Sequence, residues 1–282
     1  MDALTIDANG LRIVADHCPR PEAPLVVLAH GGGQTRHSWR DAAFRFSEAG
    51  YEVISFDLRG HGDSEWASDG RYALEDMAGD LVAILRQQGA ERPVALVGAS
   101  LGGMISLIAA VTPGVRVDAI ALVDVAPKIE PEGAARIRDF MLAHTDGFAT
   151  LEQAAEAVAV YRGHRTSSDP SSLAKNLRKH DDGRWYWHWD PAFMTKFDRS
   201  PTRRSLLDKA ASAWHGPLLL VRGLKSDILS DDSVDELRKV APQTEYVNVV
   251  GAGHMVVSDR NDAFVDAVSK FLAHHLSTQE PA

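Results

Sequence analysis

Short runs of apolar residues recur along the first half of the chain and again near its end. Such runs of four or five residues are typical of strands that are buried on both faces of a parallel sheet. The runs lie at residues 25–29, 53–56, 94–97, 119–123, 218–221 and 246–250. Between them, apolar residues fall at helical spacing. These predicted helices cover residues 72–88, 101–111, 232–240 and 261–276.

Two alternating segments, residues 4–8 and 11–15, open the chain and flank Asn9-Gly10. This dipeptide accepts the positive φ angles of a tight hairpin turn, so the segments predict an antiparallel hairpin. The alternation of strands and helices that follows predicts an α/β fold with a mostly parallel sheet covered by helices.

The strand-helix alternation stops between residues 127 and 214. We predict a helical cap there, which divides the chain into a first core part (1–126), the cap (127–214) and a second core part (215–282). The cap contains the aromatic cluster Trp185-Tyr186-Trp187-His188-Trp189. We expect Trp187, His188 and Trp189 to contribute to an apolar substrate pocket, although packing between cap and core explains the cluster equally well.

Composition narrows the classes of partner. Apolar residues make up 45% and charged residues 24% of the chain, as in an ordinary globular domain. The net charge of −9 and the lack of a basic run argue against nucleic acid as a partner. Cys18 is the only cysteine, which excludes an intrachain disulfide and a thiolate zinc cluster. With no leader-like start and no apolar run of membrane-spanning length, we expect a cytoplasmic protein without membrane contact. No motif indicates a cofactor or a metal, and oligomeric state stays open.

The strongest motif is Gly98-Ala99-Ser100-Leu101-Gly102, which lies between a predicted strand and a predicted helix. A nucleophile elbow needs this context, because glycines two residues on either side of the serine let the strand and the helix approach closely. We therefore predict that Ser100 is a nucleophile exposed above the sheet.

A serine nucleophile needs a base and a group that orients the base. His254 follows the last predicted strand across Gly251-Ala252-Gly253 and is the predicted base. Asp227, just beyond the strand at 218–221, is our first choice for the acid, since the order serine, acid, histidine is that of such enzymes. Asp124, which ends the strand at 119–123, is the alternative.

An oxyanion formed during attack needs two N–H donors. The N–H of Leu101 lies at a predicted helix N-terminus, and the second donor is expected from the loop His30-Gly31-Gly32-Gly33-Gln34, with Gly32 as our choice. A phosphate cradle is disfavoured, because neither GxGxxG nor GxxxxGK[ST] occurs.

Together these residues resemble the α/β-hydrolase superfamily, in particular its branch of esterases, lactonases, epoxide hydrolases and haloalkane dehalogenases. The resemblance is carried by His30-Gly31-Gly32, the segment 57–64, the elbow, Asp227, and Gly253-His254. It implies a mostly parallel eight-stranded sheet with an inserted helical cap, and structural roles for Arg59 and His61. Epoxide hydrolases and dehalogenases of this branch use an aspartate where this chain has Ser100, which argues against both activities.

The predicted function is hydrolysis of a carboxylic ester or lactone of a small, mostly apolar substrate through an acyl-enzyme. The same residues would also serve a perhydrolase or a C–C bond hydrolase. In the latter, Arg162, Arg165 or Arg184 could bind a substrate carboxylate. A non-catalytic ligand-binding homologue is the alternative from another class.

Overall fold

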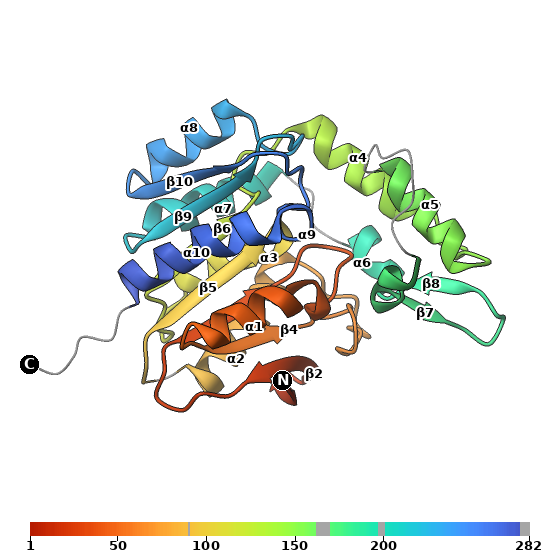
Figure 1. Ribbon diagram of the computed structural model, residues 1–282, viewed down its shortest axis with the longest axis horizontal. Coiled ribbons are helices and arrows are strands. Elements are labelled where there is room, and N and C mark those ends of the chain that lie inside the picture. The colour runs from red at the N-terminus through yellow and green to blue at the C-terminus, as the bar shows by residue number, and fades with distance from the viewer. Residues whose placement is uncertain (90, 162–169, 197–200, 277–282) are drawn as a thin grey trace, which may run out of the picture.

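Eight strands form one twisted sheet at the centre of the computed structural model, which describes residues 1–89, 91–161, 170–196 and 201–276 (Figure 1). Their order across the sheet is β1-β2-β4-β3-β5-β6-β9-β10. The bounds are β1 Asp2–Ala8, β2 Leu11–Cys18, β3 Leu25–Ala29, β4 Glu52–Phe56, β5 Val94–Ala99, β6 Ala119–Val123, β9 Leu218–Gly223 and β10 Thr244–Val249. The predicted fold class is confirmed.

Strand direction decides where a site can form. β1 and β2 make the predicted antiparallel hairpin, with Asn9 and Gly10 at φ angles of 56° and 81°. β2 pairs with β4 in antiparallel fashion, and the remaining pairings of this sheet are parallel. The carboxyl ends of six strands therefore share one edge of the sheet, the edge at which such folds bind ligands.

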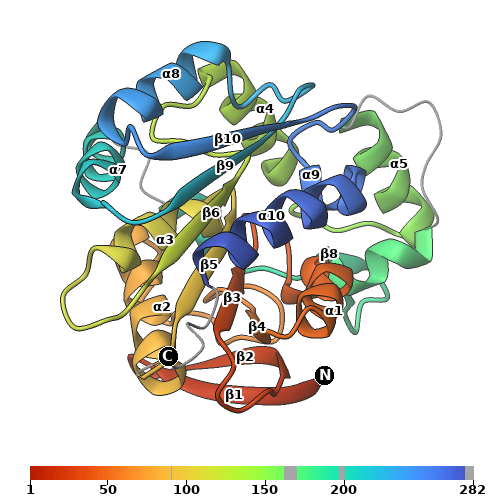
Figure 2. The same cartoon turned by 60° about the vertical axis from the view of Figure 1, so that its left-hand side comes forward.

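Helices cover both faces of the sheet (Figure 2). On one face lie α1 (Arg40–Glu48) and α10 (Asn261–His275), which pack against each other; the short η1 (Arg36–Trp39) and α9 (Val256–Asp259) adjoin them. The other face carries α2 (Leu74–Gln88), α3 (Leu101–Ala110), α7 (Pro201–Ala213) and α8 (Asp231–Val240). Each face has its own buried apolar cluster.

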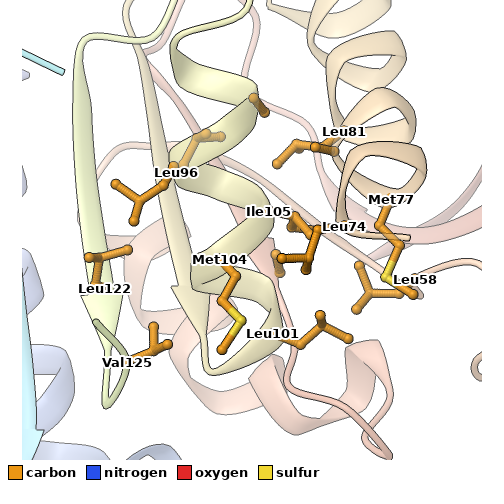
Figure 3. Close-up of a cluster of buried hydrophobic side chains, with 14 of the residues drawn as sticks. Leu58, Leu74, Met77, Leu81, Leu96, Leu101, Met104, Ile105, Leu122 and Val125 are labelled. Atoms are coloured by element: carbon orange, nitrogen blue, oxygen red, sulfur yellow. The ribbon is translucent and has the colours of Figure 1, made fainter. Parts of the chain in front are cut away.

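The helix α3 is apolar almost all round because it is packed on several sides (Figure 3). Leu101, Met104 and Ile105 lie between the strands and α2, where Leu74 and Met77 meet them. This packing fixes the first turn of α3, to which Ser100 is attached.

The segment between β6 and β9 folds mainly into helices to one side of the sheet (Figure 1). We call its elements α4 to α6 the cap. They are α4 Pro131–Leu142, α5 Leu151–Tyr161, η2 Pro170–Asn176, β7 Leu177–Lys179, β8 Trp185–Trp187 and α6 Pro191–Lys196. The following helix, α7, packs against α3 and α8 and so covers the sheet itself.

None of the helices in the described residue ranges is both long enough and apolar enough to cross a membrane.

Candidate active site

Ser100 sits in the turn between β5 and α3 with a strained backbone. Its φ angle is +49° and its ψ angle −114°, which a residue with a side chain rarely adopts. Strand and helix meet so closely that a Cβ on Gly102 would overlap the carbonyl of Ala29, and one on Gly98 would overlap the backbone of Gly102. The two glycines of the motif therefore permit the sharp turn that holds Ser100 at the carboxyl edge of the sheet.

Asp124 lies next to His254 at the same edge. The Nδ1 atom of His254 is 2.7 Å from Oδ2 of Asp124, whose side chain is fully buried. The other donors to this carboxylate are the backbone N–H of Gly223 at 3.0 Å and the hydroxyl of Ser226. With its Nδ1 proton donated to Asp124, the imidazole keeps Nε2 as a proton acceptor.

Close backbone packing places His254 at that position. A Cβ on Gly223 would overlap the carbonyl oxygen of Gly253, so the end of β9 and the loop before His254 touch directly. The residue at 223 thus supplies an N–H to Asp124 and allows the approach of the histidine loop. A larger residue there would separate the two.

Asp227, our first choice for the acid, does not meet His254. Its carboxylate is 2.6 Å from the guanidinium of Arg136 on α4 and is partly exposed. The reason is local: β9 ends at Gly223, and the turn closed by the Ser226 N–H bond to the Gly223 carbonyl directs Ser226, not Asp227, toward Asp124. The structure therefore replaces Asp227 with the alternative, Asp124, as the partner of His254.

The backbone N–H groups of the loop His30–Gln34 differ in their hydrogen-bond partners. The N–H of Gly31 bonds to the side-chain oxygen of Gln34 at 3.0 Å, and that of Gly33 bonds to Nε2 of His61 at 3.1 Å. Among the described residues, the N–H of Gly32 has no acceptor in the protein, nor has the N–H of Leu101 at the start of α3. These are the two donors predicted from the sequence, and both residues line the same cavity as Ser100.

Two buried histidines support this loop. His61 donates from Nδ1 to the Arg59 carbonyl while its Nε2 accepts the Gly33 N–H. Burial lowers its pKa to about 3. His30 is held in the same way between the Gly31 carbonyl and the Leu58 N–H, and burial lowers its pKa to about 4. Both rings are neutral near pH 7 and act as fixed spacers.

A cavity of about 620 Å³ lies between the sheet edge and the cap. Ser100, His254, Gly32 and Leu101 line its floor. Both side chains face this cavity, and no hydrogen bond joins Ser100 to His254 in the described part of the chain. The cap side is mostly apolar, with Ile137, Phe140, Met141, Trp187, Phe193 and Met194.

The predicted aromatic pocket is present in part. Trp187 and Trp189 line the cavity. His188 is not among the lining residues: its carbonyl accepts the Gly62 N–H, and burial lowers the pKa of its ring to about 4. β8 ends at Trp187, and the chain bends at His188 before Trp189 pairs with His61, so the two tryptophans line the cavity and His188 between them does not.

The cationic lining of the cavity was missed in the sequence. Arg138 of α4, Lys175 of η2 and Arg203 of α7 contribute to its walls. Of the three arginines considered from sequence, Arg162 and Arg165 lie outside the described residues. Arg184 donates to the carbonyls of Asp146 and Gly147 and does not line the cavity. The position of Arg138 at helical spacing from Ala134 and Met141 was the available signal.

Comparison with known proteins places the chain in a family. The model of the alpha/beta hydrolase fold family matches residues 24–260. The chain belongs to the α/β-hydrolase family, as its sheet and strained serine turn also indicate.

Two relatives and one solved structure resemble the chain over most of its length. An esterase of Mycobacterium tuberculosis is 33% identical over 259 residues, which cover 87% of this chain and 82% of the relative. A 3-hydroxybutyrate-oligomer hydrolase of Cupriavidus necator is 28% identical, covering 88% of this chain and 89% of that protein. Among solved structures, an alpha/beta hydrolase from Novosphingobium aromaticivorans superposes with a TM-score of 0.78 at 26% identity, over 96% of this chain and 97% of its own.

Proposed function

We propose that the chain is a serine esterase that hydrolyses carboxylic esters or lactones. The observation that carries this proposal is the pairing of the buried Asp124 with His254, which lines the same cavity as the strained Ser100. The names of the M. tuberculosis and C. necator relatives, an esterase and an oligomer hydrolase, support the same class of reaction.

The first half of the reaction forms an acyl-enzyme. The Ser100 oxygen attacks the substrate carbonyl carbon, and Nε2 of His254 takes the hydroxyl proton. Asp124 stays ionised and stabilises the imidazolium through Nδ1. The negative charge on the former carbonyl oxygen is held by the N–H groups of Gly32 and Leu101. As the tetrahedral intermediate collapses, the ester C–O bond breaks and the leaving alkoxide oxygen receives the proton from His254.

The second half returns the free enzyme. A water molecule gives a proton to His254 and attacks the acyl carbon, and the bond to Ser100 breaks as its oxygen takes that proton back. The products are an acid and an alcohol, or one hydroxy acid when the substrate is a lactone. The apolar cap wall lowers the polarity around the site, which strengthens these charge interactions.

A panel of p-nitrophenyl esters of increasing chain length, together with simple lactones, tests the proposal. We expect hydrolysis by the wild type and a fall in kcat of at least about 10⁴-fold in Ser100→Ala, because the nucleophile is lost. Ser205→Ala is the matched control, since Ser205 is an exposed serine of α7 outside the cavity. Hydrolysis that survives in Ser100→Ala would contradict the proposal.

A further inference from the structure

The charge of the cavity is opposite in sign to that of the whole chain. The chain has 39 acidic and 30 basic residues, yet no aspartate or glutamate is among the described residues that line the cavity. Its charged lining consists of Arg138, Lys175 and Arg203, from three separate elements of the chain. Positive side chains in an otherwise apolar hollow attract an anion and focus the field there.

Arg138 lies within one helical turn of Met141, which touches the loop His30–Gln34, here called the oxyanion loop. A Cβ on Gly33 would lie 3.0 Å from the terminal methyl of Met141, so Met141 covers this loop. Arg138 is three residues earlier on α4 and shares its face. The guanidinium pairs only with its exposed neighbour Asp139 among the described residues, at 2.7 Å. Such a surface pair is weak, so the guanidinium is available to a ligand.

Lys175 also lines the cavity, and its backbone adjoins the end of the same loop. Its backbone carbonyl and the side chain of Asn176 both face the hydroxyl of Thr35, which follows the glycines of the oxyanion loop. In the described part of the chain, no carboxylate lies within ion-pair distance of the Lys175 ammonium. Two cations from α4 and η2 are thus anchored near one loop, above an apolar wall.

We propose that the ester cleaved at Ser100 carries an anionic group, a carboxylate or a phosphate, on an apolar chain, and that Arg138 and Lys175 bind this group. The inference rests on the proposed function and names its substrate class. The apolar wall takes up the hydrocarbon, and the cations take up the charge with charge-assisted hydrogen bonds. A neutral ester of equal size gains only the first contribution.

The test compares three p-nitrophenyl esters of one chain length. The adipate monoester ends in a carboxylate, a second ester ends in a phosphonate, and a neutral isostere ends in an isopropyl group. We expect kcat/KM at low ionic strength to be about tenfold or more higher for at least one anionic ester than for the neutral one. The preference should shrink as salt is added, because charges near the surface are screened. The anionic ester with the larger increase in kcat/KM over the neutral ester shows whether the site prefers a carboxylate or a phosphonate.

Variants assign the preference to residues. Arg138→Gln and Lys175→Gln should each reduce the ratio of anionic to neutral kcat/KM several-fold, whereas Arg138→Lys should keep part of it. Arg238→Gln is the matched control, because Arg238 is an exposed arginine of α8 that does not line the cavity. A wild-type ratio near one, or an equal fall in the ratio for Arg238→Gln, would overturn the inference.

A binding measurement keeps the inference separate from the proposed function. Ser100→Ala is titrated by calorimetry with the same anionic and neutral esters, so no hydrolysis is required. Tighter binding of an anionic ester, lost in a Ser100→Ala, Arg138→Gln double variant, supports the inference even if the wild type hydrolyses none of the three. Equal affinities contradict it even if the neutral ester is hydrolysed by way of Ser100.

Discussion

At the residue scale, the carboxylate of Asp124 links the groups that position His254. It is fully buried and receives hydrogen bonds from a backbone N–H, from Ser226 and from His254. A buried carboxylate is stable only when its oxygens are bonded in this way. The same bonds hold the imidazole in one orientation and one tautomer.

Removing the charge of Asp124 should therefore reduce activity far more than removing that of Asp227. We expect Asp124→Asn to lower kcat by about 10³–10⁴-fold, because an amide in that place favours the wrong histidine tautomer. Asp227→Asn should leave kcat nearly unchanged, since Asp227 pairs with Arg136 at a partly exposed position. Steady-state kinetics on one ester measures both. The reverse order of effects would restore Asp227 as the acid.

The sequence predicted Ser100 and His254 for physical reasons that act locally. The glycines around Ser100 and the loop before His254 are local signals of a sharp turn and of a flexible approach. The choice between Asp124 and Asp227 could not be made from such a motif. It depended on how the four residues after Gly223 turn, and a single Ser226 contact decides that.

At the element scale, the turn from β5 into α3 depends on missing side chains. We expect Gly102→Ala to destabilise the fold by about 3 kcal/mol or more, because the new Cβ would overlap a rigid strand carbonyl. Gly79→Ala, inside α2, is the matched control: its Cβ would meet only Asn9 Nδ2 at 3.5 Å.

A helix-interior glycine costs stability relative to alanine, so Gly79→Ala should raise the free energy of unfolding by about 0.5–1 kcal/mol. Urea denaturation of both variants provides the measurement. Equal stability of Gly102→Ala and wild type would show that the turn does not need its glycine.

The strands of the main sheet and the helices α2, α3, α8 and α10 were predicted to within about three residues, whereas the three-residue strands β7 and β8 were not predicted as strands. The hairpin β7–β8 was predicted as part of a helical cap, because strands of three residues give no usable period. Its turn does carry a signal, Asp182-Gly183, with Gly183 at a φ angle of 81°. The extended backbone after this turn ends at Trp187, and a bend at His188 precedes Trp189, so the positions of these aromatic residues relative to the cavity could not be predicted from a strand period.

At the scale of the whole molecule, stability depends on histidines that must stay neutral. The folded-state pKa values of His30 and His61 are about 4 and about 3, below the unfolded value of about 6.5. The unfolded chain therefore binds more protons than the folded one between these values. The contribution of these two histidines to the free energy of unfolding is fully present above about pH 6.5, and it is lost as the pH falls toward the folded-state pKa values.

We expect the free energy of unfolding to fall by about 1.4 kcal/mol per pH unit for each of these histidines between about pH 6 and 4.5. In His61→Gln the slope should be smaller by about 1.4 kcal/mol per pH unit, which corresponds to one proton. Urea unfolding at several pH values gives the slopes. A flat profile in the wild type would contradict the burial of both rings in neutral form.

Carboxylates affect a separate pH range. Burial alone would raise the pKa of Asp16 and Glu52, but hydrogen bonds from His37 and Arg36 to Asp16, and from Arg92 and His17 to Glu52, lower each pKa to about 2. Their contribution is present above about pH 4 and is lost as pH falls below it. In an acid titration, the loss of stability caused by the histidines therefore begins at a higher pH than the loss caused by these two carboxylates.

The fold followed from the sequence because the strands of a parallel sheet are short, apolar and separated by helices. The cavity did not, because its walls combine residues from the loop after β3, from α3, α4 and η2, and from the His254 loop, which are far apart in the chain. The basic residues of that wall become a group only when the cap lies over the sheet edge.

The most direct test of the account is covalent labelling of the folded protein with a fluorophosphonate, read by intact mass and by peptide mapping. We predict one adduct per chain, on Ser100, absent in Ser100→Ala and formed much more slowly in Asp124→Asn than in Asp227→Asn. No adduct on the folded wild type, or an adduct on another residue, would contradict the serine hydrolase proposed here.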